Sequence, residues 1–213
     1  MASDHKPARG ELAVDLSDAL RRRRMVRAFS PEPLDPGMLD QLLDLARRAP
    51  SAGNTQGASF LVLDSSDAVG QYWDITLPEP RRTSFRWQQL LAAPALVVIT
   101  VDPSSYVERY AETDKRHPRL GQSQDEWSVP YWWVDAGAIA QNLLLLAVDA
   151  GLGACLFGLF EHEAAVKTSF GVPDEQRLVA TVALGRPLPD EPGRSASRQR
   201  PDVAAVIHRD GWT

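Results

Sequence analysis

The sequence has few of the residues that covalent or metal-centred chemistry requires. Cys155 is the only cysteine among 213 residues, which excludes an internal disulfide and a cysteine-based zinc site. The histidines show no metal-ligand spacing; they are His5, His117, His162 and His208. No serine stands in a nucleophile elbow, and no glycine-rich loop ends in Gly-Lys-Ser or Gly-Lys-Thr. We expect no metal site, and we predict that Cys155 is a buried thiol rather than a nucleophile.

Positive charge and long apolar runs are also scarce. Lysine and arginine number 23 against 28 aspartate and glutamate residues, which gives a formal net charge of −5. Such a chain has no overall attraction for nucleic acid or an anionic membrane, so we expect a small-molecule partner. No apolar run approaches the roughly 20 residues that span a bilayer, and residues 1–10 lack the apolar core of a signal peptide. We expect a soluble cytoplasmic protein with a disordered N-terminal stretch up to about Gly10.

What the sequence does contain is enough apolar material for a substantial core. Hydrophobic residues make up 44% of the chain, and the length suits one domain, which we place at residues 1–213. The clearest predicted strand covers residues 95–101, and its near-continuous apolar sequence indicates burial on both faces, with helices above and below. The most hydrophobic predicted helix covers residues 135–150, and Gly151 is expected to end it.

Shorter elements are predicted around these two. Helical spacing of leucines predicts a helix over residues 11–24, and Asp35 followed by Pro36 marks the start of another. Further strands are expected at residues 59–63, 155–159 and 178–184, and a further helix at 161–170. Residues 102–130 have a poor pattern, with a helix expected around 104–115, and form either a surface excursion or a lid.

A polar turn between a helix and a strand is a candidate ligand site. Pro50 stops the preceding helix, and the turn over residues 49–56 then places Ser51, Asn54 and Gln56 close together in the chain. Asparagine and glutamine side chains each carry an acceptor and two donors, so they can bind the polar edge of a planar heterocycle. We therefore predict that this turn contacts a flat ligand.

Two groups of arginines lie far apart in the sequence. The first occupies residues 21–27, at the end of the first predicted helix, and the second comprises Arg194, Arg198 and Arg200 in the C-terminal tail. The first group is either a solvated helix end or an anion site, and the residues alone do not separate these interpretations. Planar guanidinium groups suit phosphate, so two groups that met in space would form one phosphate site.

Two other features have alternative interpretations. Gly151-Leu152-Gly153 is similar to part of a dinucleotide fingerprint, but that fingerprint follows a strand and opens a helix, whereas here the helix comes first. A helix cap is the better interpretation. Aromatic residues crowd the entrance to the central helix, where they either pack in the core or stack on a flat ligand: Trp127, Tyr131, Trp132 and Trp133.

Four stretches follow one another in an order and at spacings that are typical of one family. They cover residues 23–29, 49–56, 137–153 with the Gln141-Asn142 pair, and 183–187. Together they resemble the nitroreductase family, whose members are FMN-dependent NAD(P)H oxidoreductases. The tail, with Arg198-Gln199-Arg200-Pro201 and Trp212, is also similar to the end of that family's chains.

The resemblance implies a three-layer α+β fold, with a central mixed sheet flanked by helices. It also implies an obligate homodimer with an extended C-terminal tail and two FMN sites at its interface. Arg23, Arg24 and Arg27 would hold the phosphate and ribityl chain, joined by Arg198 and Arg200 from the tail. The other implied contacts are Pro50, Ser51, Asn54 and Gln56, from the partner subunit, and the backbone at Gly158 and Leu159, which presents an N–H to flavin N5.

Two positions depart from the family's usual pattern. Met25 stands where the family often has serine, so a hydroxyl contact near the phosphate is absent while the backbone N–H remains. Gln56 is followed by Gly57-Ala58 in place of the common Pro-Trp, which changes the stiffness of the turn and the wall beside it. We expect FMN to bind in spite of both differences, with Met25 among its contacts.

The implied activity is a two-step, ping-pong oxidoreduction. NAD(P)H delivers a hydride to flavin N5 and leaves, and an electron-poor acceptor such as a nitroaromatic or a quinone takes its place. No protein acid or base is predicted, so no catalytic side chain is assigned. One alternative is a specialised flavin chemistry on the same fold, dehalogenation or ring oxidation, with residues 102–133 as a dedicated lid. Another is a non-catalytic protein that binds flavin or deazaflavin.

Overall fold

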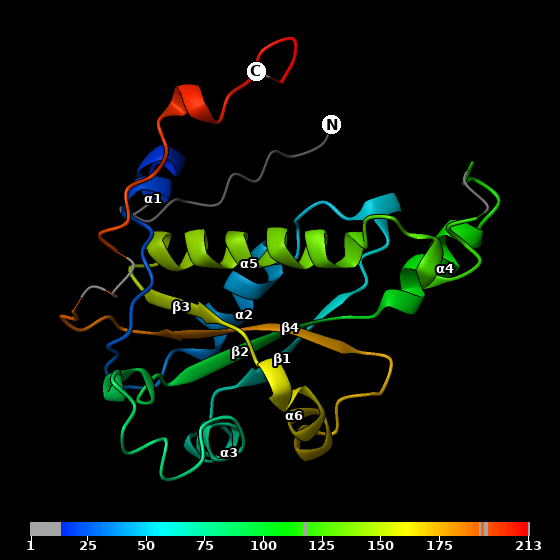
Figure 1. The fold of residues 1–213 in the computed structure, drawn as a ribbon. Coiled ribbons are helices and arrows are strands. Elements are labelled where there is room, and N and C mark those ends of the chain that lie inside the picture. The colour runs from blue at the N-terminus through cyan, green and yellow to red at the C-terminus, as the bar shows by residue number, and fades with distance from the viewer. Residues whose placement is uncertain (1–13, 117–118, 192, 194–195, 213) are drawn as a thin grey trace, which may run out of the picture.

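The chain folds around one β-sheet that lies between two layers of helices (Figure 1). The computed structural model describes residues 14–116, 119–191, 193 and 196–212, so the predictions for the N-terminal stretch and for Arg194 fall outside it. The sheet has four strands in the order β1-β2-β4-β3. Their bounds are Ala58–Leu63 for β1, Ala95–Val101 for β2, Gly153–Phe157 for β3 and Arg177–Gly185 for β4. This arrangement confirms the predicted three-layer α+β fold.

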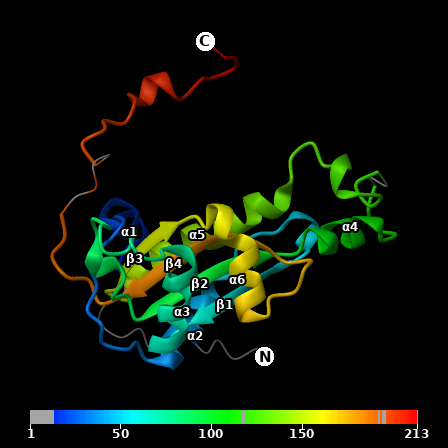
Figure 2. The same ribbon diagram turned by 60° about the horizontal axis from the view of Figure 1, so that its bottom comes forward.

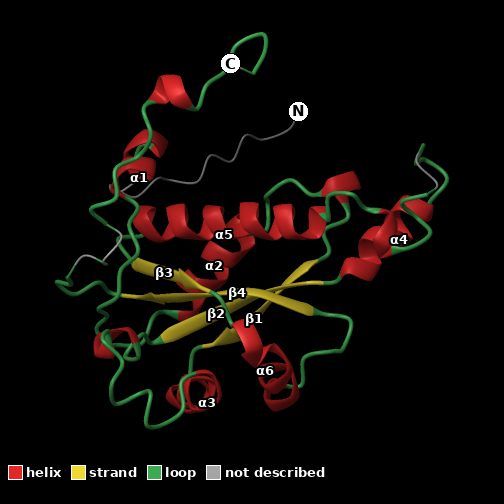
Figure 3. Ribbon diagram, in the orientation of Figure 1, coloured by secondary structure: helices red, strands yellow, loops and turns green. Residues whose placement is uncertain are grey.

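Helices α2 and α5 cover one face of the sheet, and α3 and α6 cover the other (Figure 3). The helix bounds are Leu16–Arg22 for α1, Pro36–Ala46 for α2, Ser66–Thr76 for α3, Pro103–Ala111 for α4, Tyr131–Asp149 for α5 and Glu163–Phe170 for α6. The start of α2 is as predicted, because Asp35 accepts a hydrogen bond from the Met38 N–H. No helix in the described part of the chain is long and apolar enough to cross a membrane.

All strand pairs in the described residues are antiparallel, so the prediction of a mixed sheet is wrong for this part of the chain. Ile99 of β2 lies opposite Phe60 of β1, and Val97 lies opposite Val182 of β4. β3 also pairs antiparallel with β4. Parallel neighbours require a crossover connection, and the connections through α3 and α6 instead return the chain in the opposite direction.

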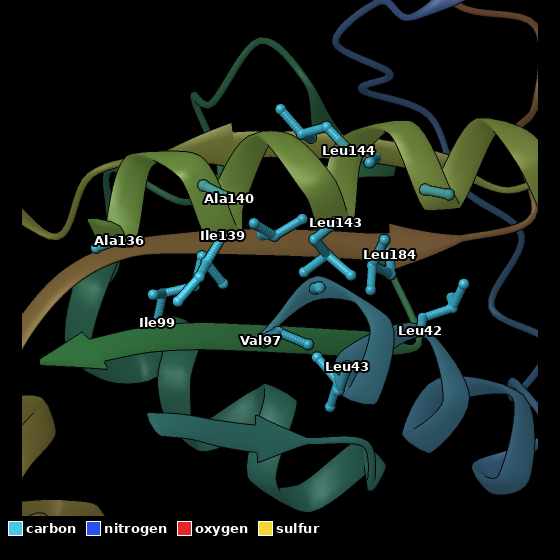
Figure 4. Close-up of a cluster of buried hydrophobic side chains, with 14 of the residues drawn as sticks. Leu42, Leu43, Val97, Ile99, Ala136, Ile139, Ala140, Leu143, Leu144 and Leu184 are labelled. Atoms are coloured by element: carbon cyan, nitrogen blue, oxygen red, sulfur yellow. The ribbon is translucent and has the colours of Figure 1, made fainter. Parts of the chain in front are cut away.

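Alternate residues of β2 belong to the two cores. Val97 and Ile99 pack with Leu143 of α5 and other buried side chains on the α2 and α5 face (Figure 4). Leu96 and Val98 belong to the core on the α3 and α6 face. Every residue of β2 is buried, as its apolar sequence predicts. The removal of this apolar surface from water is the main favourable term in such a layered fold.

The ends of α5 and β3 position several predicted site residues. α5 ends where Gly151 adopts a φ of 68° and the Leu152 N–H donates to the carbonyl of Ala147, as predicted. β3 begins and ends earlier than the predicted strand over residues 155–159. Its pairing with β4 stops where Phe157 lies opposite Thr181. Gly158 and Leu159 therefore lie in the turn after the strand.

Replacement of a core leucine tests the packing of α5 on the sheet. Leu143→Ala removes a fully buried side chain and should lower the free energy of unfolding by about 2–5 kcal/mol, because the cavity left behind refills only in part. Urea unfolding followed by circular dichroism measures the change. Leu45 of α2 is exposed, and Leu45→Ala should change the free energy by less than about 1 kcal/mol. Equal effects of the two substitutions would contradict the assignment of Leu143 to the core.

Candidate functional site

The arginine corner, residues 23–27, follows α1 and lies against β3. The N–H of Val26 donates to the carbonyl of Ala154 at 2.9 Å, which fixes the corner to the start of that strand. Met25 turns inward, and its Sδ accepts the N–H of Leu156 at 3.4 Å. The side chain of Met25, a predicted contact residue, thus packs on the sheet.

Asp190 closes the arginine corner. Its carboxylate accepts the N–H of Arg27 at 2.7 Å and lies 3.3 Å from Nη1 of Arg24. The Asp190 side chain is only 7% exposed, so these partners stabilise a buried charge. The chain reaches this position because the backbone after β4 runs beside the corner, where the Leu188 N–H donates to the carbonyl of Ala28. Sequence reasoning missed Asp190, since a contact across 163 positions leaves no local pattern.

A cavity of about 440 Å³ lies on the α3 and α6 side of the sheet. Arg27 from the corner and Gly158 from the turn after β3 both line it, so the structure brings two predicted site regions together. Leu159 is buried in the core on this face. Sequence reasoning missed Phe85 and Trp87, which lie in the irregular connection between α3 and β2. Six aromatic side chains line it, so we call it the aromatic cavity: Tyr72, Trp73, Phe85, Trp87, Phe157 and Phe160.

Stacked rings and the Arg27 guanidinium lie together in this cavity, which Arg81 and Glu161 also line. The rings of Trp73 and Phe157 stack at a centroid distance of 5.6 Å, and the guanidinium carbon of Arg27 lies 5.0 Å from the centroid of Trp87. Burial raises the pKa of the Cys155 thiol, and the charge of Arg27 opposes this shift only in part. Cys155 is therefore a buried, protonated thiol, as predicted. Within the described ranges, no group of three histidine, cysteine, aspartate or glutamate side chains is placed to bind a metal ion.

The polar turn, residues 49–56, lies at a different cavity. Pro50, Ser51 and Gln56 help to line a space of about 80 Å³, and no lining residue is shared with the larger cavity. Nε2 of Gln56 donates to Oδ1 of Asn54 at 3.1 Å, and both residues are exposed. The turn and the arginine corner therefore do not form one site within a single chain.

The C-terminal tail passes the arginine corner and then leaves the body of the protein. A side chain at Gly193 would come within 3.1 Å of the Arg27 guanidinium, so the tail begins beside that residue. From residue 196 it runs past α1 and away from the sheet (Figure 1, Figure 2). Arg198 and Arg200 are exposed on it.

The chain is similar over most of its length to several known proteins. The chain is 28% identical over 197 residues to the chloronitrobenzene nitroreductase of Comamonas testosteroni, a match that covers 80% of this chain and 86% of that protein. It is 25% identical over 199 residues to the 4-nitrobenzoate reductase of Pseudomonas putida, with 82% and 86% covered. A protein from Desulfovibrio desulfuricans, whose crystal structure contains FMN, superposes with a TM-score of 0.65 at 20% identity, with 93% of this chain and 98% of that chain covered.

Residues 20–186 of the chain match the Nitroreductase family. The matched range begins before the arginine corner, ends just after β4, and includes every strand of the sheet. The chain therefore belongs to the nitroreductase family of FMN-dependent oxidoreductases.

Proposed function

We propose that this protein is an FMN-dependent oxidoreductase that uses NAD(P)H to reduce an electron-poor acceptor, a nitroaromatic or a quinone. The observation that carries the proposal is the aromatic cavity at which Arg27 and Gly158 meet, in a chain of the nitroreductase family. Two relatives named for reduction of nitroaromatics support the acceptor class. One domain built around the single sheet carries this function.

The residues present fit FMN. A phosphate needs cationic donors at one end of the site, and the corner supplies Arg23, Arg24 and Arg27. The Arg24 side chain is 62% exposed, so its pairing with Asp190 leaves donors available to a ligand. A flat ring needs an apolar slot with polar atoms at its edge, which the aromatic wall and the Gly158 backbone supply. We assign the phosphate and ribityl chain to Arg23, Arg24 and Arg27, a backbone contact to Met25, and the ring edge to the turn at Gly158 and Leu159.

The protein contributes electrostatics and geometry to the reaction. When bound, FMN supplies the redox chemistry, by accepting a hydride from NAD(P)H and passing it to the acceptor. Arg27 places a fixed positive charge in a cavity with aromatic walls, where it stabilises negative charge on a ligand. The aromatic side chains keep water from the apolar part of the cavity. We assign no acid or base side chain to the reaction.

We infer that the complete site needs a second copy of the chain. The residues of the polar turn that we assign to the FMN of the partner lie apart from the aromatic cavity; they are Pro50, Ser51, Asn54 and Gln56. Large apolar side chains of the tail are exposed in a single chain: Val203, Val206, Ile207 and Trp212. Exposed apolar surface of this kind is typical of a region that another chain covers. Docking of the tail on the partner accounts for Arg198 and Arg200 as phosphate ligands.

A visible absorption spectrum tests the proposal most directly. The purified protein should be yellow, and the colour should bleach with NADH or NADPH and return when a quinone or a nitroaromatic is added. Flavin that neither nicotinamide bleaches would favour the specialised or non-catalytic alternatives. A colourless protein that does not bind added FMN would falsify the proposal.

Loss of one arginine from each group tests the phosphate site. Arg23→Ala combined with Arg198→Ala should raise the dissociation constant of FMN by at least about 100-fold, because each charge-assisted hydrogen bond contributes about 1.5–3 kcal/mol. The fluorescence of released FMN measures the loss. Arg119 is exposed and pairs with Glu126, so Arg119→Ala is the control and should leave binding unchanged. Retention of FMN by the double variant would place the phosphate elsewhere.

Asp190→Ala tests whether the buried carboxylate orders the arginine corner. The substitution leaves the Arg27 N–H and the Arg24 guanidinium without their partner, so it should lower the free energy of unfolding by about 1–3 kcal/mol and weaken FMN binding. Unfolding of the FMN-free protein and titration with FMN measure the two effects. The neighbouring Glu191 is exposed, and Glu191→Ala should change either quantity by less than about 0.5 kcal/mol. If the two variants behave alike, Asp190 does not support the corner.

A further inference from the structure

The segment between β2 and α5, residues 102–130, contacts the polar turn. Nε of Arg109, in α4, donates to the carbonyl of Gly53 at 2.9 Å, and Nζ of Lys115 lies 3.4 Å from the same oxygen. None of the described residues of the segment lines the aromatic cavity of its own chain. Within one chain, the segment therefore packs on the turn and does not cover that cavity as a lid.

A buried carboxylate joins the turn to two helices. Asp135 of α5 is 5% exposed, and its Oδ2 accepts both the N–H of Ala52 at 2.9 Å and the hydroxyl of Tyr106 at 2.8 Å. Burial, together with the hydrogen bond to Asp135, raises the pKa of Tyr106, so the hydroxyl stays protonated and remains a donor. A buried charge that lost either donor would be poorly compensated. Helices α4 and α5 thus hold the turn together.

The turn needs such support because its backbone is unusual. Gly53, Asn54 and Gln56 have left-handed φ angles of 63°, 57° and 55°, which residues with a side chain keep only where their surroundings fix them. A Cβ on Gly57 would lie 2.8 Å from the ring of Tyr106. The residue after Gln56 is therefore a glycine, in place of the family's common proline, at the point where Tyr106 packs against the backbone.

Arg109 is itself held in place. Its guanidinium donates to the two carboxylate oxygens of Asp114 at 2.7 and 2.8 Å and to Glu112 at 2.9 Å. The hydrogen bond from Arg109 lowers the pKa of Asp114 to about 2, so the pair is charged at neutral pH. The rings of Tyr110 and Trp127 meet edge to face at a centroid distance of 4.7 Å, which packs the end of the segment against α4.

We propose that Asp135, Tyr106 and Arg109 are positioning residues that hold the polar turn in the shape in which it contacts the flavin of the partner subunit. The contact with the flavin rests on the proposed function, whereas the support of the turn rests on the hydrogen bonds to Ala52 and Gly53. Through Tyr106 and Arg109 the segment thereby acts in cofactor recognition by way of the turn, without contact with the cofactor.

Asp135→Asn and Tyr106→Phe test whether these side chains hold the polar turn, because each substitution changes the shape of the side chain little. In the FMN-free protein, hydrogen–deuterium exchange should rise about tenfold in a peptide that covers residues 50–57 and stay unchanged in β2, because one hydrogen bond to a charged group contributes about that factor. Titration should give an FMN dissociation constant about tenfold higher for each variant. The double variant should lose little more than either single variant, because Asp135→Asn removes the charge and Tyr106→Phe a donor of one network.

Matched variants separate positioning from general stability. Tyr131 is exposed at the start of α5, so Tyr131→Phe should change neither the exchange in the turn nor the affinity for FMN. Arg109→Lys keeps the positive charge near the carbonyl of Gly53 and should loosen the turn less than Arg109→Met. If Arg109→Lys and Arg109→Met increased exchange in the polar turn equally, the charge of Arg109 would have no role in holding it.

The outcomes distinguish this inference from the function on which it rests. If hydrogen–deuterium exchange in the polar turn were unchanged in both Asp135→Asn and Tyr106→Phe, these residues would not hold the turn. Faster exchange with unchanged FMN affinity would overturn their role in cofactor recognition. A wild-type protein that binds no FMN would overturn the proposed function and the flavin part of the inference. The exchange data would still decide whether Asp135 and Tyr106 hold the polar turn.

Discussion

Burial of β2 on both faces is the constraint on which the molecule depends. A strand with apolar side chains on both faces cannot lie against water, so it takes the middle of the sheet, and helices must cover each side. This requirement places α2 and α5 on one side and α3 and α6 on the other. The two faces then differ in chemistry, because the aromatic cavity lies on one and the polar turn on the other.

Two buried carboxylates have comparable roles, one at the arginine corner and one at the polar turn. Asp190 accepts a backbone N–H of the arginine corner and pairs with Arg24, and Asp135 accepts a backbone N–H of the polar turn and the hydroxyl of Tyr106. A buried charge requires such partners, so each carboxylate specifies the position of the backbone that it contacts. Both regions assigned to FMN are therefore shaped by a negative charge that is distant in the sequence.

Local chemistry made much of the fold predictable. Asp35 and Pro36 start α2 and Gly151 ends α5 as expected, because caps and turns depend on neighbouring residues. The direction of the strands, by contrast, depends on tertiary packing, and the prediction of a mixed sheet was wrong. The contacts of Asp190 and Asp135 cross 163 and 83 positions, which no local pattern reports. Arg27 and Gly158 line one cavity, whereas Arg198 and Arg200 are exposed on the tail.

In the proposed homodimer, separation of the arginine corner from the polar turn would couple cofactor retention to assembly. In the proposed homodimer each FMN is shared between two copies, so the free energy that binds it also holds the copies together. By mass action, FMN then raises the apparent affinity of one subunit for the other, and dilution of the protein promotes loss of FMN. The fraction of holoenzyme would thus depend on how much of the protein is present, even at a constant supply of cofactor.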